Sequence, residues 1–138
     1  MPTWIQIGAH RCYVEGNLFV MELCGPVAYS EIALLLAPQD ELLKRLPSIL
    51  TLCDARQTEL PDPQVRRFLA ERGKRLGGRN ISSVVITNSL LLRTAVQLVE
   101  RASRLLTGRA LDTTFVTTEQ AAWQWIESRR AAASESFK

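Results

Sequence analysis

The alternation of strand-like and helical segments constrains the fold of this chain more than any other feature. Apolar runs at residues 49–54, 83–87 and 111–116 are each followed by a segment in which apolar residues recur every three or four positions. Strands that alternate with helices are joined by right-handed crossovers and lie parallel in one sheet. The 138 residues therefore predict one α/β domain over residues 1–130, with a mobile tail at residues 131–138.

The N-terminal segment adds antiparallel strands to this pattern. Residues 12–14 and 18–24 are apolar runs on either side of Gly16 and Asn17, an arrangement typical of a hairpin. We expect a mixed four- to five-stranded sheet with an N-terminal antiparallel hairpin and with helices packed mainly on one face. The run at residues 49–54 is apolar on both faces, which predicts that it is the central strand.

The predicted helices have recognisable boundary residues. Residues 28–46 have a helical apolar stripe interrupted by Pro38, which predicts a kink or two short helices. Asp62 followed by Pro63 is typical of an N-cap and the first helical position. Asn88 is expected to cap the third helix. The apolar stripe of that third helix is expected to face the core: Leu91, Ala95, Leu98, Val99, Ala102, Leu105 and Leu106.

Composition excludes some classes of function. The formal net charge is +3, and Arg supplies 14 of the 17 basic residues. An excess of Arg suits an anionic partner, because guanidinium groups bind phosphate and carboxylate bidentately, but codon usage in a GC-rich genome gives the same excess. A charge of +3 is too small to indicate nucleic-acid binding. The longest apolar run, residues 32–38, is too short to span a bilayer, and the first residues lack the features of a signal peptide, so we expect a cytoplasmic protein.

Residue types that bind metals or catalyse reactions are scarce. Cys12, Cys24 and Cys53 lie in apolar runs at wide spacing, and we expect them to be buried, reduced thiols. His10 is the only histidine and is expected at the surface or at the edge of the sheet. The sequence has no usual zinc-binding pattern, no paired acid and base, and no phosphate-binding glycine loop. We therefore expect no enzyme activity, no metal and no cofactor.

Several residues match a known fold once the order of the elements is considered. Gly25 precedes the first helix, Glu31 lies in its first turn, and Asp54 closes a buried strand. Phe115 is followed by Glu-Gln-Ala-Ala-Trp at residues 119–123. These features resemble the sulfate-transporter/anti-sigma-antagonist (STAS) fold. More closely, they resemble the SpoIIAA-like proteins, which are related in shape to Sec14-type lipid-binding domains.

The resemblance covers roughly residues 10–128 and implies a non-enzymatic regulatory or protein-interaction module of a bacterial cytoplasm. Classical anti-sigma antagonists have a phosphorylated serine at the start of the helix that follows the strand matched here by residues 49–54. This chain has Asp-Pro-Gln-Val at residues 62–65, so the usual phosphoacceptor serine is absent and Thr58 is the nearest candidate acceptor. The Sec14-type relation implies an alternative, a module that binds an apolar small molecule or lipid, with residues 34–36 as a lid.

The carboxyl ends of parallel strands form the edge at which α/β sheets usually bind ligands. The polar residues predicted at this edge form a candidate partner-binding site: Asp54, Arg56, Thr58, Asp62, Asn88 and Arg93. The same residues are also explained as helix caps and a solvated rim. The expected partners are a regulator protein, a second copy of the chain, or an apolar ligand or nucleotide.

A basic cluster on the second helix is a candidate docking face. Its members are Arg66, Arg67, Arg72, Lys74 and Arg75, and Arg79 follows. An acidic protein, a phosphate or an anionic membrane would suit this face, and the alternative is the solvated face of an amphipathic helix. The arginines are not interleaved with a series of aromatic residues, so nucleic acid is not expected as a partner.

Two tryptophans near the C-terminus indicate self-association. Trp123 and Trp125 lie two positions apart on a helix and cannot both face the core, so one is expected to be partly exposed. Together with the helix around Leu34 and Pro38, they give more apolar surface than one sheet face covers. This surplus predicts a homodimer, and the alternative is a monomer in which both helices pack fully.

Overall fold

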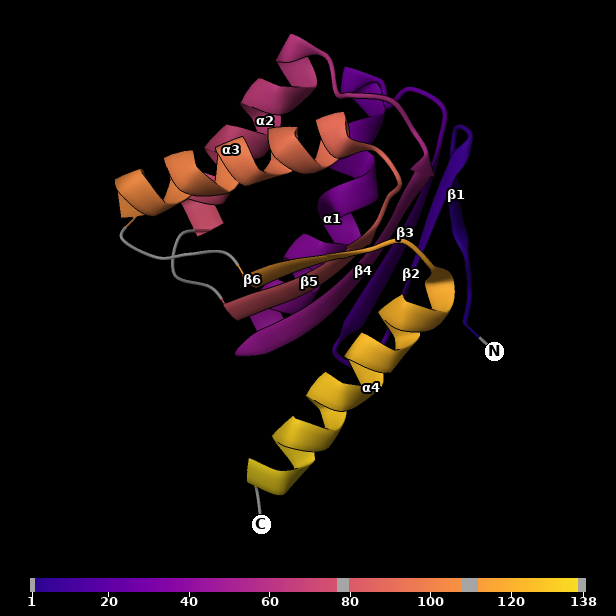
Figure 1. Ribbon diagram of the computed structural model, residues 1–138, viewed down its shortest axis with the longest axis vertical. Helices are drawn as coiled ribbons and strands as arrows, with labels where there is room; N and C mark the ends of the chain where they lie inside the picture. The colour runs from indigo at the N-terminus through magenta and orange to yellow at the C-terminus, as the bar shows by residue number, and fades with distance from the viewer. Residues whose placement is uncertain (1, 77–79, 108–111, 137–138) are drawn as a thin grey trace.

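The computed structural model describes residues 2–76, 80–107 and 112–136 (Figure 1). Its elements in chain order are β1 (Ile5–Ile7), β2 (His10–Glu15), β3 (Leu18–Cys24), α1 (Tyr29–Arg45), β4 (Ser48–Gln57), α2 (Pro63–Leu76), β5 (Asn80–Ile86), α3 (Leu90–Thr107), β6 (Asp112–Val116) and α4 (Glu119–Ser136). Arg79 and residue 111 of the predicted last strand lie outside the described ranges.

The strands form one mixed sheet whose spatial order equals their order in the chain, β1-β2-β3-β4-β5-β6. β1, β2 and β3 pair antiparallel, and β3 to β6 pair parallel. The mixed sheet with an N-terminal hairpin is confirmed, whereas the number of four to five strands is wrong, because the sheet has six. The edge strand β1 has only three residues, and so short a run gives a weak periodic signal. β4 lies between β3 and β5, as predicted for the central strand.

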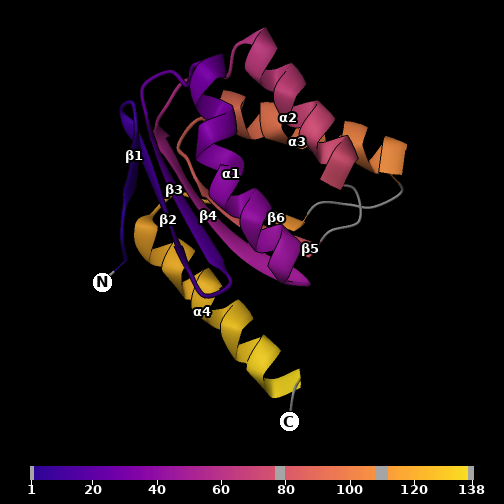
Figure 2. The same ribbon diagram turned by 180° about the vertical axis from the view of Figure 1, so that it is seen from behind.

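Helices α1, α2 and α3 cover one face of the sheet, and α4 covers the other (Figures 1 and 2). Each crossover from β3 to β6 adds the next strand on the same side, so right-handed connections place all three helices on one face. Helix α4 follows the last strand and is free to pack against the opposite face. The prediction that helices lie mainly on one face is therefore confirmed.

A hydrophobic core lies on each side of the sheet, and alternate residues of one strand contribute to both. Phe19 and Met21 of β3 belong to the core beneath α1. Leu18 and Val20 belong to the core beneath α4, where Ile126 is fully buried. Since successive side chains of a strand point to opposite faces, a strand that serves two cores has to be apolar throughout.

Helix α1 is one unbroken helix that contains Pro38. Of the two predicted alternatives, two short helices are wrong, because core packing holds the helix on both sides of the proline, and a kink at Pro38 stays a prediction. Leu35 before it and Leu42 after it are 0 and 1 % exposed. The N-cap residue is Ala28, which has no side-chain acceptor, and its N–H donates instead to Glu31 Oε1 at 2.9 Å.

Helix α3 turns a different face to the sheet from the predicted one. Leu92 is buried, whereas Leu91, Leu98 and Leu105 are 70, 58 and 87 % exposed. A shift of one position turns a helical stripe by about 100°, so these leucines lie beside the packed face. Their predicted place in the core is therefore wrong. The side chains of three other members of the stripe lie outside the described part: Val99, Ala102 and Leu106.

The ends of two helices also differ from the predictions. Ser89, rather than Asn88, caps α3, because its Oγ accepts the Leu92 N–H at 3.1 Å. Helix α4 extends to Ser136, so most of the expected tail is helical, and its mobility stays a prediction. None of the helices, within the described residues, is long and apolar enough to cross a membrane.

A buried polar network joins α1, α2 and β4. Gln39 is 4 % exposed and donates from Nε2 to Thr51 Oγ1 at 2.7 Å. Arg72 donates to Gln39 Oε1 at 2.5 Å and to Asp40 Oδ1 at 2.8 Å. Burial lowers the pKa of Arg72, and the charge of Asp40 opposes that shift. Arg72 therefore lies between two helices instead of on the predicted basic face, whose other members are exposed: Arg66, Arg67, Lys74 and Arg75.

Candidate functional site

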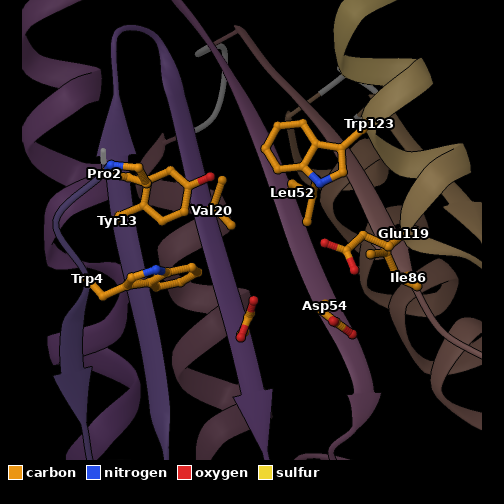
Figure 3. A pocket seen from close by; sticks show the side chains of 10 residues that line it. Pro2, Trp4, Tyr13, Val20, Leu52, Asp54, Ile86, Glu119 and Trp123 are labelled. Atoms are coloured by element: carbon orange, nitrogen blue, oxygen red, sulfur yellow. The ribbon is translucent and has the colours of Figure 1, made fainter.

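A pocket lies on the face of the sheet that α4 covers (Figure 3). Its cavity volume is about 160 Å³. The lining side chains come from the segment before β1, from β2 to β5, and from the first turns of α4. They are Pro2, Trp4, Tyr13, Val20, Glu22, Leu52, Asp54, Ile86, Glu119 and Trp123.

Strand register explains how these side chains meet. Every second residue of a strand points to the same face, so Val20 and Glu22 of β3 share a face with Leu52 and Asp54 of β4. In the parallel register Val20 lies beside Leu52, and Glu22 lies beside Asp54. The floor of the pocket therefore consists of an apolar row and, one step nearer the carboxyl ends of the strands, an acidic row.

Aromatic side chains border the apolar row on two sides. Trp4 and Tyr13 pack edge to face with ring centroids 4.6 Å apart. Trp123 reaches over Leu52 from α4 on the opposite side (Figure 3). Tyr13 is 5 % exposed and Trp123 is half-buried. The pocket is thus an apolar slot with aromatic walls that opens toward carboxylates.

Arg11 pairs with the first member of the acidic row. Its Nε donates to Glu22 Oε2 at 2.8 Å. Its Cζ also lies 3.8 Å from the centroid of the Trp4 ring, a cation–π contact. The guanidinium group therefore fixes the position of Trp4 as well as that of the carboxylate.

Arg56 pairs with the second member of the acidic row. Its Nη2 and Nε donate to Asp54 Oδ2 and Oδ1 at 2.6 and 3.0 Å. These hydrogen bonds lower the pKa of Asp54, although burial opposes the shift, so the carboxylate stays ionised. Arg56 Nη2 also lies 3.8 Å from Glu119 Oε2 in the first turn of α4.

The pocket has an excess of negative charge. Glu22, Asp54 and Glu119 line it, and among the described residues only Arg11 and Arg56 pair with them. Burial raises the pKa of Tyr13, and neighbouring carboxylates, Glu22 and Glu119 among them, raise it further. The phenol therefore stays neutral and can donate a hydrogen bond.

Two of the six predicted edge residues belong to this region. Asp54 lines the pocket, and Arg56 holds it in place. Thr58 has another role, because its hydroxyl donates to the Gly25 carbonyl at 2.8 Å and ties the loop after β4 to the end of β3.

The other three predicted edge residues lie apart from the pocket lining. Asp62 caps α2 as expected, because its Oδ1 accepts the Val65 N–H at 2.9 Å. Asn88 is exposed after β5. Arg93 stands over the ring of Phe115, with Cζ 5.4 Å from the centroid. The structure therefore does not gather the six residues into one site.

Sequence reasoning missed four of the six aromatic and acidic residues that line the pocket: Trp4, Tyr13, Glu22 and Glu119. One available signal is the spacing of two positions between an apolar residue and an acid, which occurs in Val20/Glu22 and again in Leu52/Asp54. Nothing in the local pattern shows that the two strands pair in register or that α4 returns over this face.

His10 is not at the surface, as predicted, but 1 % exposed. Its Nδ1 accepts the Cys24 N–H at 3.0 Å, which places the ring proton on Nε2, 3.4 Å from Glu31 Oε1. The histidine therefore links the end of β3 to the first turn of α1. Both ring nitrogens have partners, so the ring serves as a structural bridge.

Gly8→Ala is expected to destabilise the protein more than Gly16→Ala. Both glycines have φ of +61°, so both substitutions introduce backbone strain of about 1 kcal/mol or more. A methyl group on Gly8 also collides with the Glu31 carboxylate, which caps α1, whereas the space around Gly16 is open. Loss of that cap costs about 1 kcal/mol more. Urea unfolding of the two variants measures the difference, and equal losses would show that the carboxylate does not occupy this position.

The three cysteines are free, but only Cys12 is buried as expected, whereas Cys53 is half-buried and Cys24 is exposed. Burial, with Asp54 nearby, raises the pKa of Cys53 to about 12, and burial also raises the pKa of Cys12. Both thiols are therefore protonated at neutral pH. In the part of the chain that the structure describes, no group of three His, Cys, Asp or Glu residues is placed to hold a metal ion.

Comparison with known proteins identifies the architecture. No protein-family model matches the chain, and no curated protein matches it either. A crystal structure of an uncharacterized protein from the DUF3478 family of Shewanella loihica PV-4, with a SpoIIAA-like fold, superposes with a TM-score of 0.59 over 91 % of each chain. This chain has a SpoIIAA-like fold. The two sequences are 12 % identical, so the likeness concerns the fold alone.

The SpoIIAA-like fold confirms the architecture implied by Gly25, Glu31 and the segment at residues 119–123. Gly25 and Glu31 each have a local structural role. Gly25 has φ of +76° at the end of β3, and Glu31 completes the cap of α1. These residues define the fold, so the resemblance that they carry does not indicate a function.

Proposed function

We propose that this SpoIIAA-like chain is a non-enzymatic regulatory module that binds a protein partner through the pocket beside α4. The proposal depends on one observation, the aromatic border of Trp4, Tyr13 and Trp123 next to an acidic row. Aromatic faces and carboxylates both attract cations. The partner that fits this surface presents a lysine or arginine side chain to the pocket.

The chemistry of three groups that could act as a base supports binding instead of catalysis. A general base has to be free to accept a proton near neutral pH. Hydrogen bonds from Arg56 occupy both oxygens of Asp54 and lower its pKa, which makes it a weak base, and both ring nitrogens of His10 have partners. Cys53, with a pKa of about 12, is a protonated thiol. None of these three groups meets the requirement.

The alternative function, binding of an apolar small molecule or lipid, has less support. Leu35 and Leu36, which belong to the expected lid, are 0 and 5 % exposed and form part of a core cluster. A lid has to move aside so that a ligand can enter the cavity. The side chains of Leu35 and Leu36 are packed in the core, so this segment cannot move in that way. Carboxylates in the pocket also disfavour an apolar ligand, because desolvating them is costly.

Two features of the sequence complete the proposal. The segment at residues 62–65 has no hydroxyl group, so regulation here works by binding instead of by serine phosphorylation. A cytoplasmic location in a bacterium and a homodimer through Leu34 or the Trp123 face stay predictions. Leu34 is 60 % exposed, which leaves it available for such a contact.

Titration with side-chain analogues tests the proposal. Nα-acetyl-arginine methyl ester is expected to shift the indole NMR signals of Trp4 and Trp123, whereas Nα-acetyl-glutamate amide is not. Glu119→Gln is expected to weaken this binding about 1.4- to fivefold, since an exposed charge pair contributes about 0.2–1 kcal/mol. Glu127→Gln is the matched control, because Glu127 is an exposed residue of α4 outside the pocket lining.

Either of two results would overturn the proposal. The first is equal binding of the cationic and anionic analogues. The second is equal affinity of the Glu119→Gln and Glu127→Gln variants, which would show that the pocket carboxylate does not contact the ligand.

A further inference from the structure

Helix α3 exposes leucines along its length. Leu90, Leu91, Leu98 and Leu105 are 76, 70, 58 and 87 % exposed. They are half of the large apolar side chains that are exposed in the described residues. Leu91, Leu98 and Leu105 are seven positions apart, so they lie in line on one side of the helix, about 10 Å from one to the next. Single exposed leucines are common on protein surfaces, but a row of them marks an interaction surface.

The charged side chains around this row are almost all basic. Helices α2 and α3 lie side by side on the same face of the sheet (Figures 1 and 2). Seven of their basic residues are exposed: Arg66, Arg67, Lys74, Arg75, Arg93, Arg101 and Arg104. Among the described side chains of the two helices, Glu71 is the only exposed acid. None of the four exposed α2 cations pairs with a carboxylate within the described ranges.

The positive charge of the chain is concentrated on α2 and α3. The two helices contain eight basic and two acidic residues, a formal charge of +6, while the whole chain carries +3. The remainder of the chain is therefore at −3, and the acidic pocket lies on the opposite face of the sheet. A charge concentrated on one face produces a local potential that the net charge does not reveal.

We propose that the α2–α3 surface docks onto an anionic membrane surface. Leucines that project from a helix insert into the boundary between headgroups and acyl chains, and flanking arginines bind the anionic headgroups. The long arginine side chains can bury their methylene groups while the guanidinium groups stay at the headgroups. This inference goes beyond the proposed function and uses a different face of the molecule.

Charge and shape favour a membrane over other occupants. A second copy of the chain would bring two strongly basic surfaces together, and like charges repel across an interface. An acidic protein would have to supply a hollow for each projecting leucine. A fluid lipid interface accommodates all four without a preformed complementary shape.

Vesicle binding by the full chain tests this proposal. The protein is expected to co-sediment with vesicles of phosphatidylcholine and phosphatidylglycerol, and not with phosphatidylcholine alone. Added salt should weaken the binding, because it screens exposed charges. The double variant Arg67→Glu/Lys74→Glu is expected to lower the partition coefficient at least about tenfold. Leu91→Gln/Leu98→Gln is expected to lower it several-fold although the charge is unchanged.

Matched variants at other surfaces serve as controls. Arg130→Glu on α4 and Ile5→Gln on β1 change an exposed cation and an exposed apolar residue away from α2 and α3, and both should bind as the unaltered protein does. All variants are expected to melt at the same temperature, because every changed side chain is exposed.

Three results would overturn the proposal. One is equal binding to both kinds of vesicle. Another is undiminished binding of the leucine variant, which would show that the leucines do not insert into the membrane. The third is a dimeric mass in light scattering that the leucine variant abolishes, which would assign the face to a second copy. None of these results affects the titration of the pocket, so the two proposals fail separately.

Discussion

Replacing Leu52 by Asp is expected to prevent folding. Leu52 is 3 % exposed on β4, where Val20 lies beside it on one strand and Val84 on the other. A buried carboxylate without a partner costs several kcal/mol, and Asp54 two positions away adds repulsion. A domain of this size has only about 5–15 kcal/mol of stability in total. Circular dichroism of the purified variant should show an unfolded chain.

Leu34→Asp is the control for this prediction, because Leu34 is 60 % exposed on α1. That variant should fold and show a cooperative urea transition. A cooperative transition of similar stability for Leu52→Asp would mean that β4 does not lie in the interior of the sheet.

Arg72→Ala is expected to lower the free energy of unfolding by about 1–3 kcal/mol. The arginine side chain is 10 % exposed, and its removal leaves Asp40 and the Gln39 carbonyl without their donor. Most of this cost comes from Gln39, which is 4 % exposed and stays buried without its donor, whereas Asp40 is 34 % exposed and is partly solvated. Urea unfolding monitored by tryptophan fluorescence gives the value.

Arg67→Ala separates this effect from a general loss of positive charge on α2. Arg67 is exposed on the same helix, and its replacement should change the stability by no more than about 0.5 kcal/mol. Equal effects of the two substitutions would contradict the network that joins α1, α2 and β4.

The sequence was sufficient to predict the architecture where local pattern and global packing coincide. The alternating runs gave the parallel strands, and the paired runs around Gly16 gave the hairpin. Prediction failed where tertiary contacts determine the local structure. Pro38 stays within one helix because Leu35 and Leu42 are both anchored in the core.

Helix α3 shows a second limit of local pattern. Its apolar arc is wider than the face that a sheet can cover, so periodicity alone could not indicate whether Leu91 or Leu92 packs inward. The cap of this helix was missed by one position for a related reason. Asn88 and Ser89 are both good N-cap residues, and the choice between them depends on where the helix begins.

The pocket could not be predicted because its parts are distant in the chain. Trp4 and Trp123 lie at opposite ends of the sequence and share a cavity only because α4 crosses back over the strands. Likewise, the acidic row exists because Glu22 and Asp54 fall in register on neighbouring strands. A local sequence pattern shows neither the register of β3 against β4 nor the position of α4 over the sheet.

The agreement between strand order and chain order has a consequence for how the protein reaches its native state. Each new strand adds to the edge of a sheet formed by the residues synthesised before it, so the sheet can grow in step with translation. Helix α4 is translated after all six strands, and its Ile126 completes the second core. Until that helix leaves the ribosome, Leu18 and Val20 face water on a half-built sheet. The interval during which the nascent chain can aggregate or recruit a chaperone therefore ends with the translation of α4.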